Sequence, residues 1–174
     1  MTEPLEGAQR GTAHFDGVAT VVTKLLNMVG PDHAYFGQKD AQQAAVIRRF
    51  VTDLNIPVQV HTVPTVREPD GLAMSSRNVH LSGDYRDRAL ALSAALKAAE
   101  RATADGVHDA SAIRAAALEA MHPFGVEPEY LELVDPETLD PVTTVQDEVL
   151  VAVAARVGQT RLIDNTLIHR NGRR

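Results

Sequence analysis

An alternation of two helix patterns and two strand patterns between residues 15 and 63 constrains the fold more than any other feature. Apolar residues recur at helical spacing over 15–29 and again over roughly 39–54. Short apolar runs at 33–36 and 58–63 are typical of strands. Because the connections are short, this order predicts a parallel sheet with crossover helices. Two strands are too few for a complete doubly wound sheet, so this stretch predicts only part of an α/β core.

The second half of the chain has a different pattern. Ser82 and Asp109 are residue types that cap helices, and each precedes an apolar helical stretch. The expected elements are helices over 82–104 and 109–121 and strands over 130–134, 149–153 and 161–168. Helices followed by several strands predict a separate α+β lobe. We therefore expect two domains, 1–79 and 80–174.

Charge and composition narrow the class of protein. The formal net charge of -6 argues against nucleic acid as a partner. The absence of Cys excludes disulfides and thiolate metal sites. No apolar run approaches the roughly 20 residues that a membrane span needs, and the first residues do not resemble a signal peptide. The sequence thus predicts a soluble cytoplasmic protein without a membrane partner.

The stretch PTVREPDGLAMSSRN, residues 64–78, contains two prolines and a glycine that rule out a continuous helix or central strand. A loop of this length in a compact domain is usually functional or disordered. Hydroxyl donors and guanidinium groups suit the oxygens of a polyphosphate. The side chains that offer them here are Arg67, Ser75, Ser76 and Arg77. The stretch alone leaves a phosphate-binding lid and an ordinary solvated loop equally open.

The segment FGQKDAQQ, residues 36–43, joins a predicted strand to a predicted helix at Gly37. Helix N-termini attract anions through their free backbone N–H groups, and Lys39 adds an ammonium there. Asp40 starts the helix, and Gln43 lies on nearly the same face. Ligands of open parallel sheets bind beyond the carboxyl ends of the strands. Because both strands end in phosphate-suited loops, we favour a nucleotide site over an exposed first turn, although no Walker loop is present.

Other polar residues carry less information. The seven histidines include no pair at helical ligand spacing, so we expect no metal site. His14 is the one to watch, because it precedes the first helix close to Arg10. No G-x-S-x-G elbow marks Ser75 or Ser76 as a nucleophile.

Four motifs in this order resemble the pantothenate synthetase (pantoate–β-alanine ligase) family. They are HFDGVATVVTKLLNMV, FGQKD-A-QQ, PTVRE-DGLAMSSRN and TRLIDN. The resemblance extends from about residue 5 to residue 168. It implies the C-terminal part of a Rossmann-like nucleotidyltransferase core, followed by a small α+β lobe.

The resemblance also implies a two-step reaction. Pantoate attacks the α-phosphate of Mg-ATP to give pantoyl adenylate and pyrophosphate, and the amine of β-alanine then displaces AMP. Groups that stabilise charge on the phosphates would be catalytic. The implied catalytic residues are Lys39, Ser75, Ser76 and Arg77. The implied ATP-binding residues are Gly37, Gln38, Lys39, Asp40, Val66, Met74, Ser75, Ser76 and Arg77. The implied substrate-binding residues are Gln43, for pantoate, and His14. The resemblance implies no metal-ligating residues, and Mg2+ enters only as part of Mg-ATP.

The chain departs from the family pattern in two ways. It lacks the amino-terminal half of the core with its His-x-Gly-His motif, and Arg10 precedes His14 by one residue more than in the family. Gln38 also stands where the family often has Glu. We therefore expect an incomplete enzyme, existing as a homodimer or completed by a separate chain. The alternatives are a non-catalytic nucleotide-binding or interaction remnant and, less favoured, another nucleotidyltransferase.

Overall fold

The structure is a computed structural model that describes residues 1–170. The chain divides into two compact units, each of which is described by itself. The first unit consists of Met1–Pro64 with Glu137–Leu139, and the second of Thr65–Pro136 and the residues from Asp140 onward. No helix within residues 1–170 has both the length and the apolar character that crossing a membrane requires.

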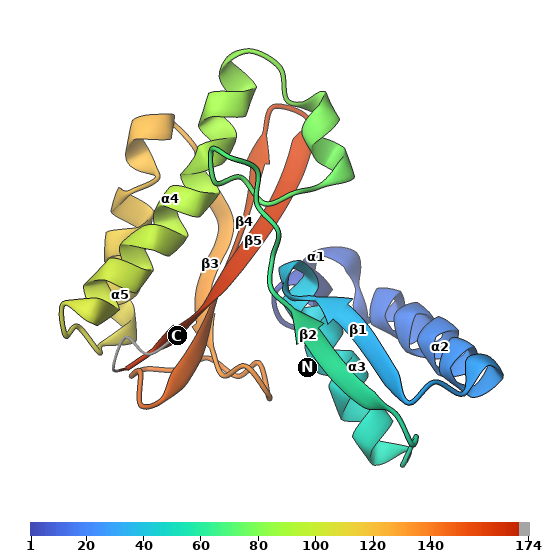
Figure 1. Cartoon of the computed structure of the whole chain (residues 1–174). Helices are drawn as coiled ribbons and strands as arrows, with labels where there is room; N and C mark the ends of the chain where they lie inside the picture. Colours follow the sequence, from blue (N-terminus) through green and yellow to red (C-terminus); the bar gives the residue numbers. More distant parts are fainter. Residues whose placement is uncertain (171–174) are drawn as a thin grey trace. The chain divides into compact units, whose positions relative to one another are not determined.

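The first unit is built on two parallel strands. β1 (His33–Gly37) pairs with β2 (Gln59–Val63), with Ala34 opposite Val60. The remaining elements are α1 (Glu6–Arg10), α2 (Thr12–Val29), the 3-10 turn η1 (Gln38–Asp40) and α3 (Ala41–Asp53). Figure 1 shows α2 and α3 alongside these strands. The predicted helix–strand–helix–strand order is confirmed.

A small core joins the helices to one face of this sheet. Ile47 on α3 is fully buried and packs with Leu26 of α2 and Val51 of α3. Ala34 and Val60 contact the same cluster from the strands. Side chains alternate between the two faces of a strand, and accordingly Tyr35 is 65% exposed. The sheet is thus covered on one face and open on the other within the described residues of this unit.

The amino-terminal residues are more ordered than the sequence predicts. The predicted helical pattern begins at residue 15, whereas residues 5–14 already contain α1 and the start of α2. Gln42, buried on α3, explains this order: its Oε1 accepts the backbone N–H of Glu6 at 2.9 Å. Its Nε2 donates to the carbonyls of Met1 and Pro4, both at 2.8 Å. A long-range side chain therefore fixes a helix of five residues that has little stability of its own.

The second unit places two helices against a three-stranded antiparallel sheet. Its sheet order is β3-β4-β5, and α4 packs against α5, β4 and β5. The elements are η2 (Ser76–His80), α4 (Asp84–Ala104), α5 (Ala110–Glu119), η3 (His122–Phe124), β3 (Pro128–Val134), β4 (Glu148–Val157) and β5 (Thr160–His169). The predicted fold class, a partial α/β core followed by an α+β lobe, is confirmed.

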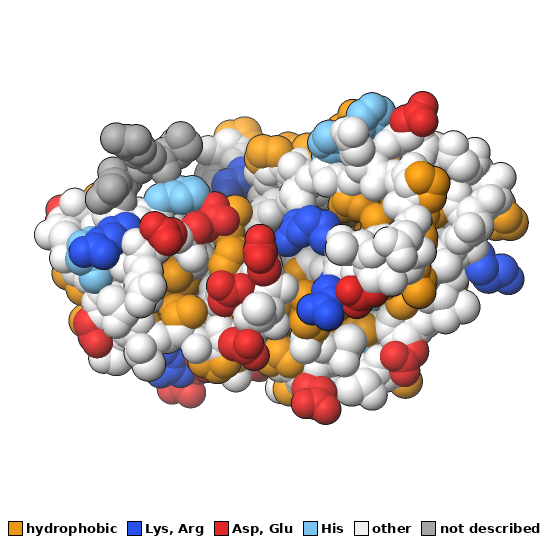
Figure 2. Space-filling view, turned by 90° about the horizontal axis from the view of Figure 1, so that it is seen from below, with side chains coloured by type: hydrophobic (Ala, Val, Ile, Leu, Met, Phe, Trp, Pro, Cys, Tyr) orange, Lys and Arg blue, Asp and Glu red, His pale blue; other side chains and the backbone are white. Residues whose placement is uncertain are grey.

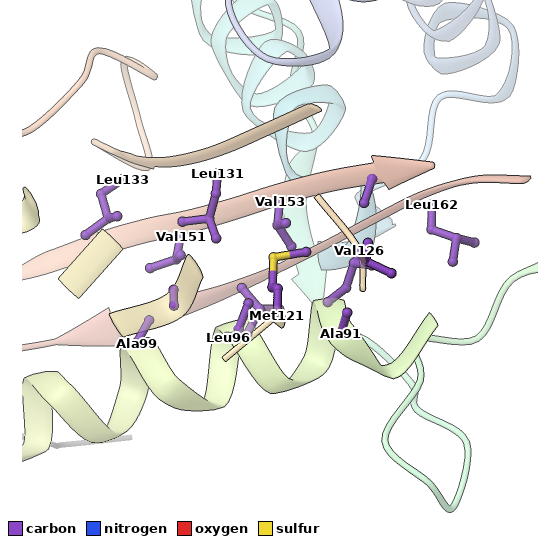
Figure 3. Close-up of a cluster of buried hydrophobic side chains, with 14 of the residues drawn as sticks. Ala91, Leu96, Ala99, Met121, Val126, Leu131, Leu133, Val151, Val153 and Leu162 are labelled. Atoms are coloured by element: carbon purple, nitrogen blue, oxygen red, sulfur yellow. The ribbon is translucent and has the colours of Figure 1, made fainter. Parts of the chain in front are cut away.

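The core of the second unit lies between α4 and the sheet. In Figure 3, Leu96 and Ala99 of α4 face Leu131 of β3 and Val151 and Val153 of β4. Small alanines on α4 let the helix approach the strands closely. Each fully buried Val or Leu contributes about 1.5–3 kcal/mol. Leu72 and Leu81, from the segment at residues 65–81, pack into the same core.

Of the two helix caps predicted in this unit, one is confirmed and one is wrong. Asp109 caps α5 as predicted, because its Oδ1 accepts the backbone N–H of Ala112 at 2.8 Å. The prediction that Ser82 caps α4 is wrong: the cap residue is Gly83, and no side chain caps the helix. A two-residue turn begins at Gly158, whose φ is +58°, and joins β4 to β5. Such turns need positive φ.

The division between the two compact units falls at a different residue from the expected boundary at 79. They divide after Pro64, so that residues 65–79 belong to the second unit. The reason lies in long-range contacts: Arg67 is ion-paired with Asp164 on β5, and Glu68 with Arg86 on α4.

Candidate functional site

The segment over residues 65–74 is an ordered hairpin. Glu68 N–H donates to the carbonyl of Leu72 at 2.8 Å, and Met74 N–H to that of Val66 at 2.9 Å. Gly71, with φ +97°, closes the turn after Pro69 and Asp70. Hairpins with three-residue loops commonly place a glycine with positive φ at this position. The predicted loop is confirmed, because no helix or named strand covers residues 64–75, and backbone hydrogen bonds order its turn.

Arg67 anchors this hairpin to β5. Its Nη1 and Nη2 donate to the two carboxylate oxygens of Asp164 at 2.6 and 3.0 Å, and Nη1 also donates to the carbonyl of Gly71 at 3.1 Å. The side chain of Asp164 is only 2% exposed and that of Arg67 30%. The hydrogen bond to Asp164 is the main cause that raises the pKa of Arg67. Such two-pronged pairs fix geometry as well as charge.

Arg86, in the first turn of α4, forms a second anchor. Its guanidinium bonds Glu68 at 2.7 Å and Asp70 at 3.0 Å. The hydrogen bond from Arg86, followed by one from Asn78, lowers the pKa of Glu68. The pKa of Asp70 is lowered first by the backbone N–H of Leu72 and then by Arg86. Both carboxylates are therefore held ionised around one guanidinium.

Residues 74–77 form the exposed tip of this segment. Met74 is 54% exposed, Ser76 and Arg77 are exposed, and Ser75 is half-buried. Ser75 Oγ accepts the backbone N–H of Arg77 at 3.2 Å, which starts the turn η2. Asn78 then ties η2 to the hairpin through the Glu68 carboxylate at 2.6 Å and the Ala73 carbonyl at 3.0 Å. The tip thus presents two hydroxyls and a guanidinium on a braced support.

The other group of predicted site residues lies in the first unit, after β1. The strand ends at Gly37, residues Gln38–Asp40 form η1, and α3 starts at Ala41 with Asp40 as its cap residue. Lys39 and Gln43 are half-buried. The predicted strand-to-helix turn is present, although a 3-10 turn precedes the helix. Gln42, beside Gln43, has the structural role described above, which the double glutamine in the sequence did not reveal.

The remaining candidate residues are Arg10 and the histidines, and each has contacts of its own. Arg10 is ion-paired with Glu6 at 2.8 Å, so its guanidinium serves α1. His14 is exposed in the first turn of α2, where its ring meets Phe15 edge-on. His33 and His61, from neighbouring strands, bring ring nitrogens within 3.0 Å of each other. Among residues 1–170 no group of three or more His, Cys, Asp or Glu is arranged to hold a metal ion.

The predicted ATP-binding residues therefore fall into two groups, one in each unit. Those of the first unit are Gly37, Gln38, Lys39 and Asp40; those of the second are Val66, Met74, Ser75, Ser76 and Arg77. On the face shown in Figure 2, Asp and Glu side chains lie among Lys and Arg side chains, without a continuous basic surface over its described residues.

Comparison with known proteins shows the family. The family model described as pantoate-beta-alanine ligase matches residues 1–167. The pantothenate synthetase of Thermotoga neapolitana is 53% identical over 169 residues, which are 97% of this chain and 60% of that protein. Pantothenate synthetase 1 of Bradyrhizobium diazoefficiens is 55% identical over 170 residues, 97% of this chain and 59% of that protein.

Solved structures agree. The crystal structure of pantothenate synthetase from Thermus thermophilus matches with a TM-score of 0.89 and 46% identity, covering 95% of this chain and 59% of that one. A pantoate-beta-alanine ligase from Francisella tularensis, complexed with beta-gamma ATP and beta-alanine, matches with a TM-score of 0.68 and 29% identity, covering 95% and 54%. The chain thus spans about 60% of the length of the curated relatives it matches. It belongs to the pantoate–β-alanine ligase family.

Proposed function

We propose that this chain supplies ATP-side residues of an enzyme that condenses pantoate with β-alanine. In the first step the pantoate carboxylate attacks the α-phosphorus of ATP, and pyrophosphate leaves. In the second step the β-alanine amine attacks the acyl carbon of pantoyl adenylate, and AMP leaves with pantothenate as product. We also propose a cytoplasmic location, where ATP is available.

The observation that carries this proposal is the braced tip at residues 74–77. Ser75 and Ser76 offer hydroxyl donors, and Arg77 offers a permanently charged fork, beside one another on an ordered segment. Preorganised donors stabilise developing charge better than mobile ones, because no reorganisation is needed during the reaction. We assign these three side chains to the phosphates of ATP, with Met74 beside them in the same loop and Val66 at the adenine end.

Lys39 and its neighbours form the group of proposed ATP-binding residues in the first unit. The ammonium of Lys39, a half-buried residue, would neutralise phosphate charge, while Gly37, Gln38 and Asp40 would bind from the turn between β1 and α3. Gln43, and with less support His14, would bind pantoate.

Mg2+ fits this proposal as part of the nucleotide. Mg2+ is commonly held by substrate phosphates and one or two carboxylates, without a full cage of protein ligands. The described residues contain no such cage, whereas Asp40 provides an exposed carboxylate at the start of α3. When bound, the ion would offset phosphate charge.

The remaining catalytic groups would come from the part of the relatives that this chain does not cover. In the family that part carries the His-x-Gly-His motif. Support comes from the first unit: its described residues cover one face of β1 and β2, and Val63 and Tyr35 are exposed on these strands. Parallel sheets are normally covered on both faces. We propose that further strands and helices complete this sheet, from the same polypeptide or from a separate chain, with a homodimer as the alternative assembly.

The test is ATP binding by Lys39→Ala, with Lys24→Ala as the matched control. Lys24 is an exposed lysine of the same unit, on α2. Titration calorimetry with Mg-ATP is expected to show at least about tenfold weaker binding in Lys39→Ala, because a charge-assisted contact contributes about 1.5–3 kcal/mol. Lys24→Ala should bind as the wild type. Equal affinities in all three proteins would contradict the assignment.

A non-catalytic nucleotide-binding remnant is the second candidate. The two readings differ in one result: a remnant would bind Mg-ATP and would release no AMP even when joined to the missing part of a relative.

A further inference from the structure

We infer that Arg86 positions the phosphate-binding tip at residues 74–77, acting through Glu68 and Asn78. This inference rests on the proposed function, because it assigns the tip to phosphate. Arg86 itself lies outside the proposed ATP-binding groups, on the first turn of α4. It would act as a positioning residue that holds the tip without touching the nucleotide.

The contacts form a continuous path from the helix to the tip. Arg86 bonds the Glu68 Oε2 at 2.7 Å, and Glu68 Oε1 accepts from Asn78 Nδ2 at 2.6 Å. Asn78 Nδ2 also donates to the carbonyl of Ala73 at 3.0 Å. Ala73 and Asn78 flank residues 74–77 on either side. One guanidinium therefore fixes both ends of the tip through a single carboxylate.

The hydrogen bonds of the Asn78 amide show that its nitrogen faces Glu68 and Ala73. Both of its donor bonds are made, whereas its Oδ1 is buried and finds no hydrogen-bond partner among the described residues. A buried acceptor without a partner is unfavourable. The two donor bonds toward Glu68 and Ala73 therefore outweigh this cost, which is consistent with a side chain that crosslinks the segment.

A purely stabilising role explains the Arg86 cluster poorly. Glu68, Asp70 and Arg86 lie at the surface, where ion pairs add little to global stability. Arg67 and Asp164 already attach the hairpin to β5 through a more buried pair. What Arg86 adds is a second attachment, on the Glu68 side that Asn78 links to the tip. Its expected effect is on the order of the tip and on the geometry of the groups that meet phosphate.

Hydrogen exchange of the amides at residues 66–78 tests this inference directly. The variant is Arg86→Gln and the matched control is Arg88→Gln. Arg88 is on the same helix, but its guanidinium donates to the carbonyls of Phe124 and Gly125, away from the hairpin. Without nucleotide, Arg86→Gln is expected to exchange roughly threefold to tenfold faster at the amides of Met74, Arg77 and Asn78.

The control and a conservative variant complete the design. Arg88→Gln should leave these amides unchanged. Arg86→Lys keeps a positive charge between Glu68 and Asp70, and it should restore most of the protection. The inference is overturned if Arg86→Gln exchanges like the wild type, or if Arg88→Gln accelerates the same amides equally. It is also overturned if Arg86→Lys is as fast as Arg86→Gln.

Addition of Mg-ATP separates this inference from the proposed function. We expect the nucleotide to slow exchange at the tip in the wild type, and Arg86→Gln to need severalfold more nucleotide for the same effect at an unchanged unfolding temperature. A wild-type tip that does not respond to Mg-ATP would count against the proposed function alone. The comparison without nucleotide would still decide whether Arg86 positions the tip.

Discussion

Asp164→Asn tests whether the hairpin depends on its buried anchor. The carboxylate accepts both prongs of Arg67, and its Oδ1 also accepts the backbone N–H of Asn165 at 2.8 Å. The amide keeps the shape but turns one oxygen into a donor that faces the guanidinium. Breaking a buried ion pair costs about 3–5 kcal/mol. Because water reaches the Arg67 side chain, which is 30% exposed, we expect a cost at or just below the lower end, about 2–3 kcal/mol.

Urea unfolding gives this cost a measurable form. We follow unfolding by far-ultraviolet circular dichroism. With a slope of about 1–3 kcal/mol per molar urea, the urea midpoint of the second unit should fall by roughly 0.7–3 M. Glu132→Gln is the matched control, because its ion pair with Arg114 is exposed and spans 3.8 Å. That variant should lose less than about 0.5 kcal/mol. If Asp164→Asn lost no more than Glu132→Gln, the anchor would not hold the hairpin.

Two further predictions concern the hairpin at low pH and the hydrophobic core of the first unit. The pKa of Glu68, lowered mainly by Arg86, and that of Asp70, lowered mainly by the Leu72 N–H, both lie below their ordinary values of 4.5 and 3.8. A group with a lowered pKa stabilises the fold above its ordinary pKa and loses this contribution as the pH falls through the folded value. Exchange protection at residues 66–78, corrected for intrinsic rates, should therefore stay constant near neutral pH and decrease once the pH is below these ordinary pKa values. Protection that stays constant until both carboxylates are protonated would contradict this prediction. Ile47→Ala should destabilise the first unit by about 2–5 kcal/mol, because Ile47 is fully buried in a small cluster; exchange in α3 should accelerate while exchange in β4 does not, and equal acceleration in both would refute the reasoning.

The elements with strong local patterns could be predicted from the sequence. β1, α3 and β2 follow from apolar periodicity and from the breaks between them, and α5 from its Asp109 cap. β4 and β5 are longer than predicted, because pairing across the Gly158 turn extends both strands beyond their apolar centres. Local propensity indicates where an element exists, but tertiary pairing sets its ends.

The supports of the candidate site could not be predicted from local pattern. Arg67 and Asp164 are 97 residues apart in the chain, and their pairing depends on where β5 lies. Gln42 acts through carbonyls of the amino-terminal segment, which have no sequence signature. His33 and His61 meet only because the parallel register brings their strands together. The residue types of Ser75, Ser76 and Arg77 were enough to propose a phosphate site, whereas the contacts that brace them could be seen only in the fold.

The most direct test of the central claim is AMP formation by a fusion protein. The part of the Thermotoga neapolitana pantothenate synthetase that this chain does not cover would be joined ahead of Met1. With Mg-ATP, pantoate and β-alanine, each omitted in turn, we predict that the fusion releases AMP only when all three are present, and that the chain alone releases none. Lys39→Ala in the fusion should abolish the release. A folded fusion that binds Mg-ATP but forms no AMP would contradict the claim that this chain carries the working ATP side of the ligase.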